Sequence, residues 1–170
     1  QLIRLQCHEG IDEDKAVYEW NYKKQLLSIQ TEQDSKNLFT EEFLIERPIL
    51  QSLRSNEKSI FLVDEIDRSD EEFEALLLEV LAENQVSIPE LGTITAKNDN
   101  LTVLTSNATR ELSEALRRRC LYFYLDYPSV DIETKVILNN VENIDEEKAK
   151  KFSIFSNFVR SLGLNKPPSL

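Results

Sequence analysis

The 170-residue chain is poor in glycine, which limits the phosphate-binding structures it can form. Only three glycines are present, and no Gly-Lys pair occurs: they are Gly10, Gly92 and Gly163. A loop that cradles phosphate with successive backbone N–H groups needs several glycines close together. No segment of these 170 residues has that composition.

Cysteines and long apolar runs are also scarce. Cys7 and Cys120 lie far apart in or beside apolar stretches, and they form neither a CxxC motif nor a metal set with the single His8. We expect two buried free thiols in a reducing compartment. No apolar run approaches the roughly 18–20 residues that cross a bilayer, and no signal peptide opens the chain. We therefore expect a cytoplasmic protein without a membrane span.

Basic residues are outnumbered, with 20 Lys and Arg against 31 Asp and Glu, for a net charge of −11. An acidic surface repels phosphate backbones, so we expect no nucleic-acid partner. One basic cluster, 117–119, stands against this background. The apolar fraction of 41% is ordinary for a globular chain, and the length suits one domain, alone or with a small second unit.

Hydrophobic patterns predict alternating strands and helices. Residues 2–7 alternate as a half-buried strand does, and continuous apolar runs predict strands buried on both faces at 59–63, 101–105 and 121–125. Expected helices run from Glu13 to about Ile29 after an Asp12 cap, from Pro48 to about Ser55, from a Ser69/Glu72 capping box, and over 113–119. We also expect an exposed loop at 31–37, a hairpin pairing 86–88 with 93–95, and two helices within 132–162.

This order predicts an α/β fold with a mostly parallel sheet. We place the core at residues 1–128 and a small all-helical unit at 129–170.

Three polar motifs follow these elements. Asp64 and Glu65 leave an apolar strand at the end where open α/β sheets bind ligands, and nucleotide hydrolysis needs a carboxylate near Mg²⁺ and a group that orients water. The alternative is that they only favour a helix start. Thr105, Ser106 and Asn107 end the next strand, where an amide can bind water or phosphate, or simply form a capping turn.

The third motif is Arg117-Arg118-Arg119, directly before Cys120. An arginine here can stabilise transition-state charge in the phosphate site of a neighbouring subunit. The alternative is a solvated basic face that pairs with the protein's own carboxylates.

Taken together, the order and spacing of these motifs resemble a AAA+ ATPase core read from Walker B through sensor 1 to the arginine finger. The segments 63–68, 78–81, 104–107 and 126–129 are similar to the MoxR branch, in particular to its subgroup associated with carbon-monoxide dehydrogenase maturation. The resemblance extends from Leu2 to Pro168.

It implies a P-loop NTPase-type parallel sheet flanked by helices, followed by part of an all-helical lid, with ATP and Mg²⁺ as ligands. The strand that feeds the phosphate loop is missing from these residues, and its slot should separate residues 121–125 from the strand at 101–105. Residues 19–43 correspond to an insertion in helix 2, and residues 86–95 to a hairpin that faces the pore and touches client protein.

The resemblance also assigns roles. Asp64 would help hold Mg²⁺ through water, Glu65 would activate the attacking water, and Asn107 would be the sensor-1 residue, with Thr105 and Ser106 beside the nucleotide. Arg119 would be the finger, with Arg118 as the alternative. The expected partners are further copies in a ring, such as a hexamer, and a client protein, with a metalloenzyme among the candidates.

Two functions remain open. The chain belongs to an ATPase that remodels or matures client complexes, or it is a non-catalytic subunit that docks on an active ATPase and supplies Arg119 in trans. We expect a Walker A loop before Leu2 and a sensor-2 arginine after 166–168 in the first case.

Overall fold

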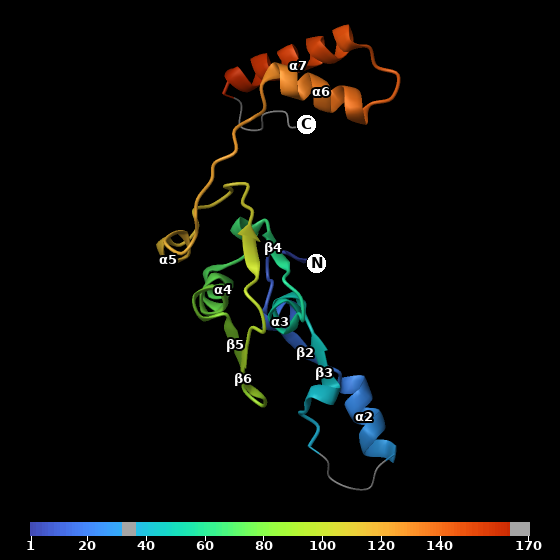
Figure 1. The fold of residues 1–170 in the computed structure, drawn as a ribbon, viewed down its shortest axis with the longest axis vertical. Helices are drawn as coiled ribbons and strands as arrows, with labels where there is room; N and C mark the ends of the chain where they lie inside the picture. The colour runs from blue at the N-terminus through green and yellow to red at the C-terminus, as the bar shows by residue number, and fades with distance from the viewer. Residues whose placement is uncertain (32–36, 164–170) are drawn as a thin grey trace. The chain divides into compact units, whose positions relative to one another are not determined.

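The computed structural model describes residues 1–31 and 37–163 (Figure 1). The chain forms two compact units, Gln1–Tyr122 and Phe123–Leu170. The loop predicted at 31–37 lies mostly outside the described residues.

A parallel sheet organises the first unit. Its strands are β1 (Leu2–Gln6), β4 (Ile60–Asp64) and β7 (Leu101–Leu104), in the order β1-β4-β7 with β4 at the centre. Gln6 pairs with Asp64 and Val63 with Leu104, so the carboxyl ends of all three strands meet at one edge. The predicted α/β class and three of its four strands are confirmed.

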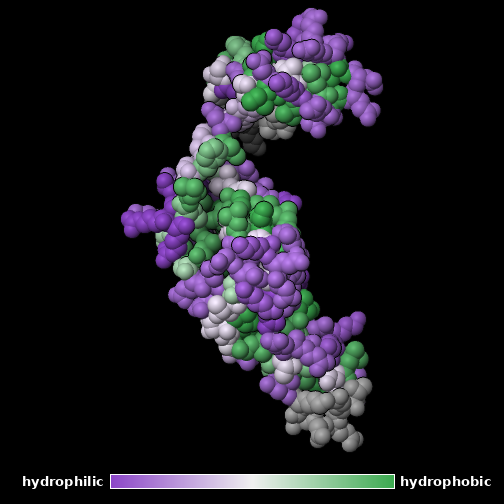
Figure 2. Space-filling view, viewed as in Figure 1, coloured by the Kyte–Doolittle hydropathy of each residue, from purple (hydrophilic) through white to green (hydrophobic). Residues whose placement is uncertain are grey.

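One face of this sheet forms the core. Ile3, Leu5, Phe61 and Val63 are buried beneath α3 (Pro48–Arg54), which begins at Pro48 as predicted. The opposite face carries the exposed side chains of Leu2, Ile60, Leu101 and Val103. It contributes to the apolar green surface of the core unit in Figure 2. The prediction that β4 and β7 are buried on both faces is therefore wrong, because no element of the described core covers this side.

The fourth predicted strand, residues 121–125, is also absent. These residues have no strand partner in the described part of the chain, and the side chains of Leu121 to Leu125 are 70–100% exposed. An apolar run becomes a strand only where a neighbour accepts its backbone hydrogen bonds. The outer edge of β7 is not that neighbour, since β7 pairs with β4 alone.

The single helix predicted from Glu13 to Ile29 is interrupted. It consists of α1 (Glu13–Ala16), capped by Asp12 as expected, then β2 (Tyr18–Trp20) and α2 (Tyr22–Thr31). β2 pairs antiparallel with β3 (Leu44–Glu46), which follows the 3-10 turn η1 (Glu41–Phe43). Tyr18 and Trp20 are buried on either side of Glu19, and their rings meet edge to face at 5.9 Å. Alternating aromatic residues favour a strand, which explains the break.

The elements that flank the site follow the prediction with one correction. After η2 (Ile66–Arg68) comes α4 (Glu71–Glu83), whose cap is Asp70 and not Ser69. Asp70 Oδ1 accepts Phe73 N at 2.9 Å, while Ser69 Oγ donates to Ile66 O at 2.8 Å. The hairpin of β5 (Gln85–Ile88) and β6 (Gly92–Thr95) is confirmed, and α5 (Glu114–Arg117) begins after a Ser113 cap.

The second unit is a helical hairpin of α6 (Val130–Asn140) and α7 (Glu146–Ser161), as predicted. Its centre is polar. Arg160 donates to both carboxylate oxygens of buried Glu133, at 2.9 and 2.8 Å, and its guanidinium lies 4.4 Å from the centre of the Tyr127 ring. Within the described residues of both units, no helix is long and apolar enough to cross a membrane.

Candidate active site at the carboxyl edge of the sheet

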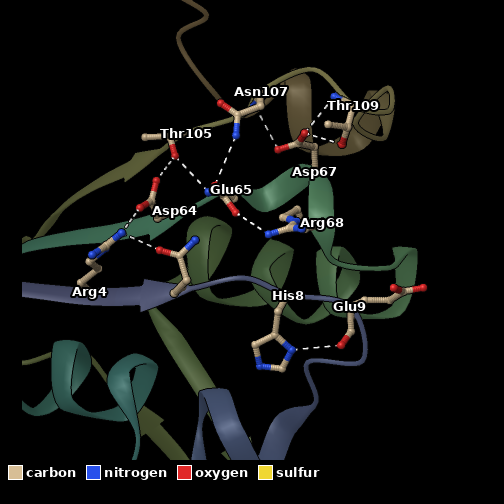
Figure 3. Close-up of polar contacts among 11 residues, drawn as sticks. Arg4, His8, Glu9, Asp64, Glu65, Asp67, Arg68, Thr105, Asn107 and Thr109 are labelled. Atoms are coloured by element: carbon tan, nitrogen blue, oxygen red, sulfur yellow. Dashed lines mark hydrogen bonds and ion pairs between the residues drawn. The ribbon is translucent and has the colours of Figure 1, made fainter. Parts of the chain in front are cut away.

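Asp64, the last residue of the central strand, is fixed from both sides (Figure 3). Its Oδ1 accepts a hydrogen bond from the Thr105 hydroxyl, and its Oδ2 forms an ion pair with Arg4 of β1. The hydrogen bond from Thr105, followed by that from Arg4, lowers the pKa of Asp64. Asp64 is therefore ionised at neutral pH, with its carboxylate already oriented.

Glu65 turns away from Asp64. Its backbone has a φ of 55°, in the left-handed region, so the two adjacent carboxylates diverge. Glu65 Oε1 accepts Asn107 Nδ2 at 3.4 Å, and Oε2 pairs with Arg68 at 3.1 Å. The conformation costs about 1–3 kcal/mol in a residue with a side chain and persists only where surrounding contacts hold it. Here Thr105 holds it: the Glu65 N–H donates to Thr105 Oγ1 at 3.0 Å and the Ile66 N–H to Thr105 O at 2.9 Å.

The segment after β7 brings Asn107 to Glu65, whereas Ser106 has a local role. Ser106 Oγ accepts the N–H of Ala108 at 3.1 Å, which closes a tight turn. The predicted site residues Asp64, Glu65, Thr105 and Asn107 are thus brought together. Ser106 is adjacent, but its hydroxyl is engaged within its own turn.

The arginine cluster lies apart from this group. Arg118, the residue after α5, pairs with Glu114 at the start of that short helix, and Arg119 Nη1 donates to Ala115 O at 3.2 Å. The side chains of Arg117, Arg118 and Arg119 are exposed, and α5 forms part of the purple surface in Figure 2. Among the described residues, neither Arg118 nor Arg119 forms a hydrogen bond or ion pair with Asp64, Glu65 or Asn107.

Three residues that contribute to this edge were missed by the sequence analysis as site residues: Arg4, Asp67 and Thr109. Arg4 occupies the exposed face of a half-buried strand, where a charged residue is ordinary, so its partner gives no signal in the sequence. In the sequence Asp67 is one more acid near a helix start, which gives it no separate signal. In the structure it is buried and accepts hydrogen bonds from Asn107 N and from Thr109.

The residues at this edge fit a magnesium ion whose other ligands would be water and phosphate oxygens. No cluster of three or more His, Cys, Asp or Glu residues in the described chain is arranged to hold a metal ion. Mg²⁺ in nucleotide sites takes one or two carboxylates, with water and phosphate oxygens completing its shell. The ionised carboxylate of Asp64, with the hydroxyl of Thr105 beside it, suits that partial role. A cavity of about 490 Å³ lies elsewhere, at the amino ends of the strands near Gln1 and residues 54–57.

Cys7 follows β1 and is hydrogen-bonded to the end of β4, next to the carboxylates of the site. Its N–H donates to Asp64 O at 2.8 Å, and its side chain is buried. Burial raises the pKa of the Cys7 thiol to about 12, and the negative charges of Asp64, Asp67 and Glu65 add to that effect. Cys120 is also a free thiol, but it is only half-buried, against the prediction of two buried cysteines.

The family profile of the AAA domain, dynein-related subfamily, matches residues 2–120, which span the sheet, both polar segments and α5. The chain belongs to this AAA family. Members of the family generally use ATP and Mg²⁺ and assemble as rings. No curated protein sequence matches the chain significantly.

Two solved structures are similar to this AAA chain. One is a crystal structure of a candidate ATPase from Cytophaga hutchinsonii, with 20% identity and a TM-score of 0.52 over 93% of this chain and 46% of that one. The other is the complex between subunits BchI and BchD of magnesium chelatase, with 15% identity and a TM-score of 0.48 over 95% and 49%. The first supports the AAA+ fold, and the chain spans about half the length of both.

Proposed function

We propose that this chain carries the hydrolytic residues of a AAA+ ATPase of the MoxR type, which couples ATP hydrolysis to the remodelling or maturation of client protein complexes. The observation that supports hydrolysis most directly is the pair of diverging carboxylates at the end of β4. Asp64 is ionised and held by Thr105, and Glu65 reaches Asn107 at 3.4 Å.

The carboxylates divide the work because their surroundings differ. Asp64, with both oxygens engaged by donors, suits a fixed negative charge beside a hydrated cation. Mg²⁺, when bound with ATP, neutralises charge on the phosphates. Among the described residues, the Glu65 carboxylate has a long contact to Asn107 and an ion pair with exposed Arg68, so it remains able to take a proton from water. Asn107 orients the water or a phosphate oxygen through its amide.

The arginines would act between subunits. Arg118 and Arg119 are exposed directly after α5, and among the described residues they have no hydrogen bond or ion pair with Asp64 or Glu65 of their own chain. A ring in which α5 faces the nucleotide of the next copy would use one of them as the finger. Arg119 is the first choice and Arg118 the second, since Arg118 is already paired with Glu114.

The first experiment uses the full-length protein with Glu65→Gln, and with Glu72→Gln as a control at an exposed position in the first turn of α4. Glu65→Gln should lower kcat about 10²-fold or more while ATP affinity is retained, because only proton transfer is lost. Glu72→Gln removes the same charge and should leave kcat unchanged. Equal kcat values for the two variants would contradict the assignment of Glu65.

A second experiment mixes Glu65→Gln with Arg119→Ala after verified subunit exchange. Each variant alone should be inactive, but a mixed ring contains interfaces in which both groups are intact, so ATPase activity should partly return. No return at any mixing ratio would rule out Arg119 acting in trans, and Arg118→Ala would then be tested in its place. A full-length protein that never hydrolyses ATP but stimulates another ATPase would support the non-catalytic docking subunit.

A further inference from the structure

Two segments about forty residues apart in sequence are joined along their length at the candidate site. Residues 64–74 begin at the last residue of β4, and residues 105–113 follow β7. Thr105 bonds to Asp64 and Glu65 at one end of this pair of segments. At the other end, Arg110 donates to Ser69 O at 3.0 and 2.6 Å, and Glu74 Oε2 accepts Ser113 N at 2.9 Å.

Asp67 joins the middle of the two segments. Its Oδ1 accepts Asn107 N at 3.1 Å, and its Oδ2 accepts both Thr109 N at 2.9 Å and Thr109 Oγ1 at 2.6 Å (Figure 3). Its side chain is buried, with 3% exposure, and no cation among the described residues pairs with it. Burying a carboxylate costs free energy unless hydrogen bonds replace those it made to water. The three donors therefore stabilise the buried charge of Asp67, and Asp67 in turn holds the three donors in place.

Asn107 and Thr109, which are hydrogen-bonded to Asp67, lie on either side of a residue with a strained backbone. Ala108, between Asn107 and Thr109, has a φ of 55°, a left-handed conformation that residues with a Cβ rarely adopt. Asp67 fixes the backbone on both sides of Ala108. It thereby sets the direction in which Asn107 leaves the turn, which brings its amide to Glu65 Oε1 at 3.4 Å. Asp67 itself does not reach Glu65, so it acts on the site through Asn107.

We infer that Asp67 is a positioning residue: its buried carboxylate holds the strained turn at 107–109 so that Asn107 faces Glu65. The effect on hydrolysis rests on the proposed function, whereas the hold on the turn does not. If the role is only to stabilise the fold, Asp67 and Asn107 should affect the reaction independently.

The first test is independent of catalysis. Asp67→Asn keeps the shape but replaces one acceptor oxygen with an NH₂ donor, which must face a donor of Asn107 or Thr109. The matched control is Asp70→Asn, which accepts a single backbone N–H and remains a good helix cap. Hydrogen exchange followed by NMR should show the amides of Asn107 and Thr109 exchanging about 10-fold faster or more in Asp67→Asn, and unchanged in Asp70→Asn. Unchanged exchange in Asp67→Asn would overturn the inference.

The second test measures ATP turnover in the full-length protein. Asp67→Asn should lower kcat roughly 10- to 100-fold, as misplacement of a catalytic group does, with ATP affinity changed by less than about 3-fold. In an Asn107→Ala background the same change should lower kcat by no more than about 2-fold, because the group it positions is already gone. Equal fold losses in both backgrounds would overturn the link to Asn107.

Two controls keep the outcome interpretable. If Asp67→Asn does not fold, as judged by the fluorescence of the single Trp20, Thr109→Val removes only the hydroxyl donor. It should speed exchange at position 109 and lower kcat several-fold, and wild-type values for both would refute the inference. If the wild-type protein itself has no ATPase activity, the proposed function fails, and the exchange experiment alone decides whether Asp67 holds the turn.

Discussion

Replacing Glu133 by glutamine should unfold the second unit while the first stays folded. Glu133 and Arg160 form the bidentate pair between α6 and α7, with side-chain exposures of 1% and 8%. The substitution removes the buried negative charge that faces Arg160 and sets an NH₂ group against a guanidinium donor. Breaking such a pair costs about 3–5 kcal/mol.

That cost is large for a unit of this size. Whole domains are stable by only about 5–15 kcal/mol, and a hairpin of two helices belongs at the low end. The rest of the α6–α7 interface offers little compensation, since its buried members include Thr134 and Ser153, joined at 3.2 Å, and Ala149. At about 4–8 °C per kcal/mol for a small domain, the midpoint of the second unit should fall by at least roughly 10 °C.

The assay separates the two units. Trp20 is the only tryptophan, is buried in the first unit, and reports its unfolding by fluorescence. Hydrogen exchange of 130–161 reports the second, and helical circular dichroism reports the helices of both units. The control is Glu147→Gln, which breaks the exposed pair with Lys151 on α7, worth less than about 1 kcal/mol. If Glu133→Gln and Glu147→Gln destabilise the helices equally, the ion pair does not hold this unit together.

Calorimetry should detect little or no binding of Mg-ATP to the 170-residue polypeptide, because no glycine-rich loop is present in it, and micromolar affinity would reveal a different site. The pKa values of Asp64 and Asp67 are lowered, that of Asp67 because hydrogen bonds from Thr109 and Asn107 outweigh the opposing effect of burial. Their stabilisation should be complete above about pH 5 and lost as the pH falls through the lowered values, so urea midpoints below about pH 5 should drop less steeply in Asp67→Asn. At pH 8 an alkylating reagent should label Cys120 before Cys7, whose thiol has a pKa of about 12, and equal labelling in native protein and in urea would contradict the burial of Cys7.

The sequence predicted the sheet well because its signals are local. Apolar runs followed by polar residues located β4 and β7, and the adjacency of these two strands then brought Asp64 close to Thr105. The failures come from long-range effects. Residues 121–125 have the composition of a strand but no partner, and residues 13–29 have helical spacing until Tyr18 and Trp20 pair with a strand more than twenty residues later.

Within the site, the polar motifs at the strand ends predicted which residues lie close together, but not the directions of their side chains. A glutamate gives no sign that it will adopt a φ of 55°, and an aspartate after Ile66 gives no sign that it will bind residues forty positions away. These conformations depend on contacts between residues 64–74 and 105–113, because those contacts offset the free-energy cost of a left-handed backbone.

The backbone of Glu65 also determines which substitution tests its chemistry. Glycine at this position would relieve the left-handed strain, remove the contacts to Asn107 and Arg68, and let the start of η2 relax. A loss of turnover in Glu65→Gly could then come from any of the three. Glutamine keeps the Cβ, the chain length and an oxygen that accepts from Asn107, and it removes only the charge and basicity of the carboxylate. Loss of turnover in Glu65→Gln with the exchange rates of 107–109 unchanged therefore assigns the defect to proton transfer, whereas faster exchange would assign it to the collapse of the turn.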